Sequence, residues 1–128
     1  MSSSKLYSEV EISSEVLTAS GHRQVQMLME KCLREITEAK TAIKDANIQK
    51  KNKAIASAAD IVSYLRVCLN FEDQRAETLA AQLDSLYAFM TKNFLQATLY
   101  QDQAYLDQAQ TVLLNIKEGW DGIASESK

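Results

Sequence analysis

The chain has 128 residues, with one His, two Cys and no Pro, and it carries 14 basic against 17 acidic side chains. Its length and its hydrophobic fraction of 46% predict one globular domain, and the net charge of −3 argues against nucleic-acid binding, which relies on clustered basic side chains. Because no apolar run is long enough for a bilayer span or a signal peptide, and the two Cys are not clustered, we expect a reduced, cytoplasmic protein without membrane insertion.

Residues 1–19 are rich in Ser and follow no helical pattern. Tyr7 and Val10 are among the apolar residues scattered through this stretch. We expect a flexible N-terminal arm, with room for one short helix, that is able to lie across the rest of the chain.

Apolar residues recur three or four positions apart from Ser20 to Ala46, which predicts a first amphipathic helix. Ser20, or alternatively Thr18, is the candidate for its N-terminal cap, and Asn47 is the predicted stop. A second stripe of the same spacing covers residues 54–69.

A third stripe covers residues 76–97, and residues 100–102 are the predicted break after it. A fourth covers residues 105–120, where Gly119 and Gly122 predict the end of the helix. Because only a few residues connect these helices, neighbours must run antiparallel. The prediction is an all-α, up-down-up-down four-helix bundle over residues 20–122, followed by a frayed tail at 123–128.

The sequence offers few groups for catalysis or metal binding. His22 is the single His, so paired Glu-x-x-His motifs for a di-metal site cannot be formed, and Cys32 and Cys68 lie at no zinc-site spacing from it. We expect a solvated His22, two cysteines packed in the core, no metal, no cofactor and no enzymatic activity. A histidine-phosphotransfer bundle, in which His22 next to Arg23 accepts the phosphate, is the alternative from another class.

The start of the second helix is basic, with Lys50, Lys51 and Lys53. A cluster of this kind usually forms a solvated face. The alternative is a contact for an acidic partner, since the N-terminal end of a helix disfavours Lys.

The second and third helices carry more apolar residues than a bundle core needs. Surface Ala explains part of this excess, but it does not explain Tyr64, Val67 and Phe89 together. We therefore expect an exposed apolar groove where a partner segment docks. Self-association through the same surface is the alternative.

Several stretches resemble the motifs of FliS, the flagellin export chaperone family. Residues 18–20 read TAS, and residues 58–69 read AADIVSYLRVCL. Residues 83–90 read LDSLYAFM, similar to the family's L-x-x-L-Y-x-Y-M, and residues 116–120 read IKEGW, similar to its closing L-R-x-x-W. Tyr7 stands where the family has a Tyr in its N-terminal arm.

The resemblance implies an antiparallel helical bundle in the cytoplasm with no catalytic activity. It implies that the chain binds the disordered C-terminal segment of flagellin about one-to-one, prevents its premature polymerisation and assists its type III export. The flagellar export gate and a regulatory co-factor protein are further partner candidates.

The same resemblance suggests which residues hold the client. Two are in the arm, where they would cover the groove until the client displaces them, and the others are on the second and third helices. The set is Tyr7, Val10, Ile55, Ile61, Tyr64, Leu65, Leu86, Tyr87 and Met90. For each of them the alternative is burial in the bundle's own core.

Overall fold

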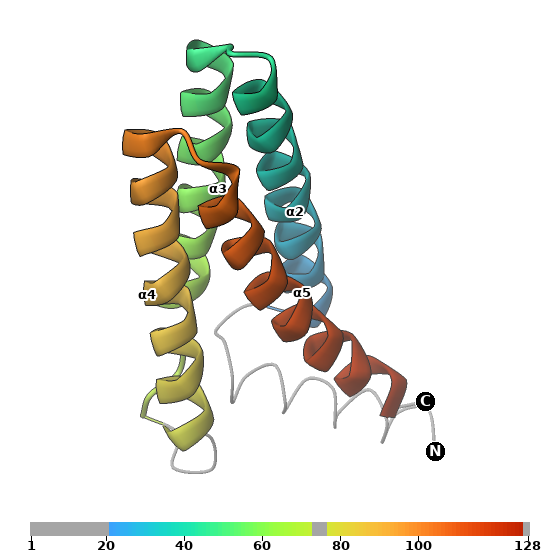
Figure 1. Ribbon diagram of the computed structural model, residues 1–128. Coiled ribbons are helices and arrows are strands. Elements are labelled where there is room, and N and C mark those ends of the chain that lie inside the picture. The colour runs from blue at the N-terminus through green and yellow to red at the C-terminus, as the bar shows by residue number, and fades with distance from the viewer. Residues whose placement is uncertain (1–20, 73–76, 127–128) are drawn as a thin grey trace.

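The computed structural model describes residues 21–72 and 77–126, the last three of these by backbone alone. Within these ranges the chain forms four helices and no strand: α2 (His22–Lys44), α3 (Ile48–Val67), α4 (Glu77–Tyr100) and α5 (Gln103–Glu126). The predicted all-α four-helix architecture is confirmed (Figure 1). No helix in the described ranges is both long and apolar enough to cross a membrane.

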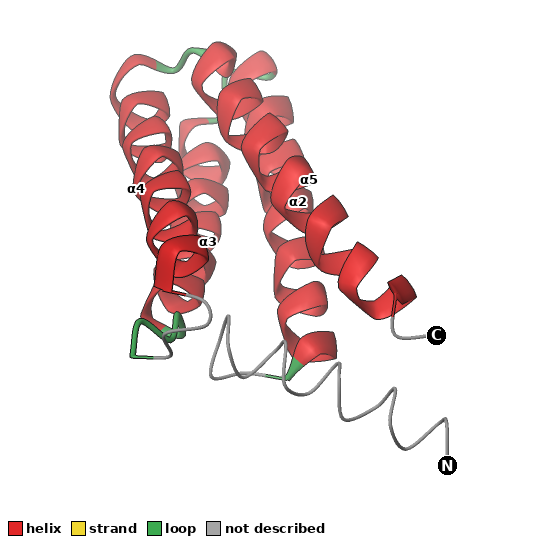
Figure 2. Ribbon diagram, turned by 90° about the horizontal axis from the view of Figure 1, so that it is seen from below, coloured by secondary structure: helices red, strands yellow, loops and turns green. Residues whose placement is uncertain are grey.

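The four helices form a ring. Each helix packs against its neighbours in sequence, and α5 also packs against α2. In Figure 1, α4 and α5 are joined at the top and diverge toward the bottom, and the view from below in Figure 2 shows the same separation. The bundle is therefore closed at one end of the α4/α5 pair and open at the other.

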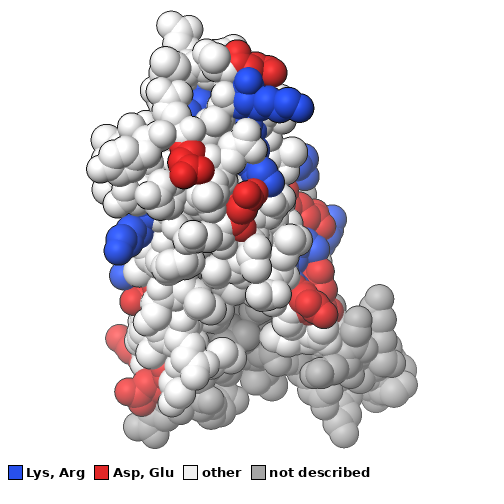
Figure 3. All heavy atoms as spheres, viewed as in Figure 1, with Lys and Arg blue, Asp and Glu red and all other residues white. Residues whose placement is uncertain are grey.

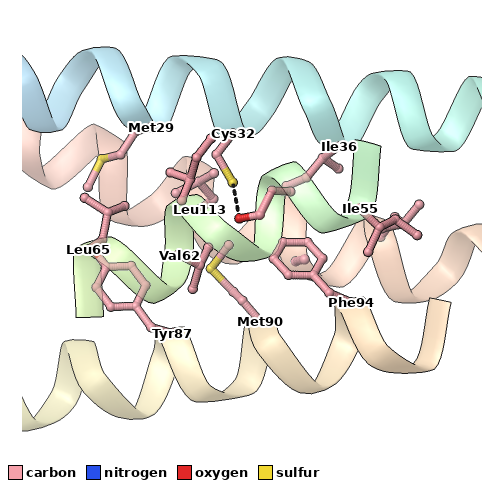
Figure 4. Packing of buried hydrophobic residues seen from close by; sticks show 14 of the residues in the cluster. Met29, Cys32, Ile36, Ile55, Val62, Leu65, Tyr87, Met90, Phe94 and Leu113 are labelled. Atoms are coloured by element: carbon pink, nitrogen blue, oxygen red, sulfur yellow. Dashed lines mark hydrogen bonds between the residues drawn. The ribbon is translucent and has the colours of Figure 1, made fainter. Parts of the chain in front are cut away.

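The core is built from the apolar stripes of all four helices. Tyr87, Met90 and Phe94 of α4 point toward α3 and α2 (Figure 4). The thiol of Cys32 donates a long hydrogen bond to the carbonyl oxygen of Ala58, 3.7 Å away, which links α2 to α3. Each large side chain buried in this way stabilises the fold by about 1.5–3 kcal/mol relative to an exposed position.

The starts of α2 and α3 differ from the prediction. Helix α2 begins at His22 with Gly21 as its N-cap and no side-chain cap, while the candidate caps Thr18 and Ser20 lie outside the described residues. Asn47 does more than end the first helix: its side-chain oxygen accepts a hydrogen bond from the backbone N–H of Lys50 and so caps the start of α3.

The predicted end of the last helix at Gly119 and Gly122 is wrong, because α5 continues to Glu126. Neither glycine has a positive φ. Packing of α5 against α2 and α4 outweighs the low helix propensity of glycine, which amounts to about 1 kcal/mol at each position.

Candidate functional site

An apolar groove opens where α4 and α5 diverge. It has a volume of about 320 Å³ and is lined by α4 and α5 on its two sides and by the first turns of α2 at its floor. We call it the α4/α5 groove. Its lining residues are Val25, Met29, Leu79, Leu83, Leu86, Tyr87, Asn115, Ile116, Gly119, Trp120 and Ile123.

Each wall of the groove is formed by apolar residues that lie beside the core-facing stripe of its helix. Leu79, Leu83 and Leu86 recur three or four positions apart along α4, beside the stripe that enters the core. Leu79 is 44% exposed and Leu86 is 38% exposed, although both are large aliphatic side chains. Apolar surface that the bundle leaves in water in this way is available to bind another apolar segment.

Gly119 widens the groove on the α5 side. A Cβ atom at this position would meet no heavy atom within 4 Å. Because Ile116 and Ile123 flank it at helical spacing, the missing side chain leaves a gap between two apolar ridges.

The groove has almost no electrostatic character. None of the residues that line the groove is charged. Asn115 contributes an amide side chain, which is polar but uncharged. In Figure 3 the charged side chains lie at the edges and in the upper part of this face, and its lower part between α4 and α5 is largely uncharged. Recognition here would therefore depend on burial of apolar surface and on shape.

The floor of the groove is held by His22 and Trp120. The Trp120 indole Nε1–H donates to the backbone oxygen of His22 at 2.9 Å, and His22 Nε2 lies 2.7 Å from the backbone oxygen of Trp120. Since a carbonyl only accepts, Nε2 carries a proton and donates. The two rings stack with centroids 4.6 Å apart. The expectation of a solvated His22 is wrong, and its engaged ring gives the phosphotransfer alternative no support.

The predicted site residues that the structure describes fall into three groups. Leu86 and Tyr87 line the groove, although Tyr87 is only 2% exposed. Tyr64 is 50% exposed in a separate shallow depression beside Met27, between α2 and α3. The residues buried in the bundle core are Ile55, Ile61, Leu65 and Met90. Tyr7 and Val10 lie outside the described residues.

Comparisons of the sequence with known proteins identify its relatives. A sequence model of the flagellar protein FliS matches residues 3–127. The chain belongs to the FliS family. The flagellar secretion chaperone FliSB of Pseudomonas aeruginosa is 36% identical over 124 residues, which cover 97% of each chain. The flagellar secretion chaperone FliS of Vibrio cholerae is 36% identical over 94% of this chain and 87% of its own, and that of Salmonella typhimurium is 25% identical over 96% and 90%.

Two of the FliS-like stretches contribute to the groove. The stretch 83–90 supplies Leu83, Leu86 and Tyr87, and the closing stretch 116–120 supplies Ile116, Gly119 and Trp120. Leu79, Leu83 and Ile116 lie on the predicted helix stripes, but their spacing alone does not mark them for binding. The α4/α5 groove thus joins two FliS-like motifs that are about one helix apart in the sequence.

Both cysteines of this FliS-family chain are buried, and its single His is hydrogen-bonded to Trp120. Burial, and secondarily the nearby Glu35 carboxylate, raise the pKa of Cys32 to about 12, so the thiol stays protonated. Burial also raises the pKa of Tyr87. Among residues 21–72 and 77–126, no three His, Cys, Asp or Glu side chains come together as a metal site. The two cysteines are both buried and form no disulfide.

The basic cluster at the start of α3 is not simply a solvated face. Lys51 is buried, and its Nζ donates to the backbone oxygen of Thr98 at 3.0 Å, near the C-terminal end of α4. Lys50 pairs with Glu38 of α2 at 2.9 Å. The expectation of solvation is therefore wrong for Lys51, which stabilises the closed end of the bundle and is not accessible to a partner.

Proposed function

We propose that this FliS-family protein is a cytoplasmic flagellar secretion chaperone that binds the C-terminal segment of flagellin in the α4/α5 groove. Binding keeps the segment from polymerising before export and assists its delivery to the type III export apparatus. The observation that carries the proposal is the uncharged groove of about 320 Å³ on an otherwise well-packed bundle. The relatives' printed names, which describe flagellar secretion chaperones, support it.

The physical basis is the burial of apolar surface that the client cannot bury by itself. An unfolded apolar segment gains about 25 cal/mol for each Å² that it removes from water in the groove. Ordering the segment costs about 2–5 kcal/mol, which limits the affinity and allows release. No bond is made or broken in this process, so the function requires no catalytic residue and no cofactor.

Among the predicted contacts, Leu86 and Tyr87 are the ones that this groove supports. Leu79 and Ile116 join them as proposed contacts, since they form its walls. Tyr64 remains a proposed contact for a client long enough to reach the α2/α3 depression. Contacts of Tyr7 and Val10 stay a prediction, as do the export gate and a regulatory co-factor protein as further partners.

The proposal is tested by titrating a flagellin C-terminal peptide of several tens of residues into the protein, followed by calorimetry and circular dichroism. We expect about one-to-one binding with a gain in helicity. Absence of heat together with unchanged circular dichroism would refute the proposed function.

Two glycines of α5 give a matched pair of variants that places the binding site. Gly119 and Gly122 are both helical and both border open space, but only Gly119 lines the groove. Gly119→Leu fills the groove and should weaken binding tenfold or more, whereas Gly122→Leu should leave the affinity within about twofold. Equal affinities of the two variants would contradict the site.

Light scattering on the free protein separates client binding from the alternative of self-association, which predicts a mass above that of the monomer.

A further inference from the structure

One turn of α5 is tied to the start of α2 by hydrogen bonds and a stacked ring pair. His22 and Trp120 exchange two hydrogen bonds and stack their rings. In the next turn of α2, the side-chain amide of Gln26 donates to Asp121 at 2.7 Å, and Lys117 pairs with the same carboxylate at 2.6 Å. We call the reciprocal His22–Trp120 contact the latch.

The latch fixes the rotation of α5 about its own axis. Successive helical residues point about 100° apart, so Asp121, which accepts a hydrogen bond from Gln26 of α2, lies on one side of Trp120 around the helix axis. Ile116, Gly119 and Ile123 lie on the other side of Trp120, and they form the α5 wall of the groove. In Figure 1, α5 crosses in front of α2, and its C-terminal end lies far from α4.

An open apolar groove needs such a restraint. If the C-terminal half of α5 moved against α4, the exposed surfaces of Leu79 and Leu86 would leave water, and the hydrophobic effect favours that movement. The latch opposes it with two hydrogen bonds and an aromatic stack that are made only while α5 lies against α2.

We infer that His22 and Trp120 act as positioning residues that hold the α5 wall away from α4 and so keep the α4/α5 groove open. The binding part of this inference rests on the proposed function, whereas the separation of the two walls does not. The test therefore measures both quantities.

The separation is measured by electron spin resonance between nitroxide labels on Gln82→Cys and Glu118→Cys, which are exposed positions on α4 and α5 outside the groove lining. All variants share a background in which Cys32 and Cys68 are replaced by Ala. In the latch variant His22→Ala we expect the α4–α5 distance distribution to become shorter or broader and the affinity for the flagellin peptide to fall tenfold or more. His22→Gln, whose amide can still donate to the Trp120 carbonyl, should recover part of both.

Lys40→Met is the matched control. Lys40 forms an ion pair with Asp107, at 2.6 Å, which joins the same two helices nearer the closed end of the bundle. This variant should change neither the distance distribution nor the affinity. If His22→Ala lowers the helical content, Trp120→Phe takes its place, because it removes the indole donor and keeps an aromatic ring, although a smaller one.

The outcomes separate the two proposals. A distance distribution in His22→Ala that matches that of Lys40→Met would overturn the positioning role, even if the unaltered protein binds the peptide. A changed distribution, together with no peptide binding by any variant, would support the positioning role and overturn the proposed function.

Discussion

The two ends of the α4/α5 pair use their apolar residues differently. At the closed end, Phe94 and Leu106 are fully inside the core, and small residues such as Ala97 and Ala109 are buried with them. At the open end, Leu79 and Leu86 remain partly in water. The same pair of helices therefore provides stability at one end and a binding surface at the other. The comparison suggests that a substitution should affect either the stability of the fold or the affinity for the client, according to the end where it lies.

The largest expected effect is at the closed end. Phe94→Ala leaves a cavity in the core and should lower the free energy of unfolding by about 3–5 kcal/mol. Leu79→Ala, at the open end, should lower it by about 1 kcal/mol or less, because that side chain is already half in water. Urea denaturation of both variants measures the difference. Equal losses would show that the groove wall belongs to the core.

Lys51→Met should give the next largest effect. The Thr98 carbonyl is one of the last four of α4 and has no partner within its own helix, and Lys51 donates to it. Without that donor we expect a loss of about 1–3 kcal/mol. Lys53→Met is the control, since Lys53 is exposed. The expected affinity for the peptide is unchanged in both variants, and a loss of affinity in Lys51→Met would show that the two ends are coupled.

A smaller effect of opposite sign is expected at the turn between α4 and α5. Gln101 has a φ of 53°, in the left-handed region that strains any residue with a Cβ. Gln101→Gly should raise the free energy of unfolding by about 0.5–1 kcal/mol. Ala46, with a φ of 56°, offers the same change at the α2–α3 connection as a comparison. Thermal denaturation that shows no gain for either variant would contradict this account of the strain.

The smallest effect is a pH dependence at the open end. Burial alone would raise the pKa of Asp121, but hydrogen bonds from Lys117 and Gln26 outweigh it and hold the pKa below the ordinary 3.8. The ionised carboxylate therefore stabilises the fold above pH 3.8, and this contribution, less than about 1 kcal/mol, is lost as the pH falls through the lowered value. Denaturation between pH 2 and pH 6 should show a shallower decline for Asp121→Asn. Identical profiles would exclude a role for this carboxylate.

The fold could be predicted because its signal is local. A helix that buries one face repeats its apolar residues every three or four positions, whatever its partner is, so the four stripes were visible without any tertiary information. The family resemblance rested on the same local strings, and the comparisons confirm it.

The groove could be predicted only in part, because burial depends on which flank of a helix meets a neighbour. Leu86 and Tyr87 are adjacent in sequence and both line the groove, yet one is partly exposed and the other is buried. The helical spacing assigns both residues to the apolar side of the helix. It does not separate the stripe that enters the core from the residues beside that stripe.

The latch and the buried Lys51 escaped prediction for a different reason. His22 and Trp120 are 98 positions apart, and neither has a local pattern that indicates the other. Lys51 likewise donates to a carbonyl 47 positions away. Contacts of this kind become visible only when the helices have been placed in space.

The position of Trp120 has a practical consequence. It is the only tryptophan of the chain, it lines the groove, and it is stacked on an imidazole ring. Its ultraviolet emission should therefore respond to any segment that enters or leaves the groove. With a tryptophan-free peptide, rapid mixing would then record the rates of loading and release directly, without any dye attached to either molecule.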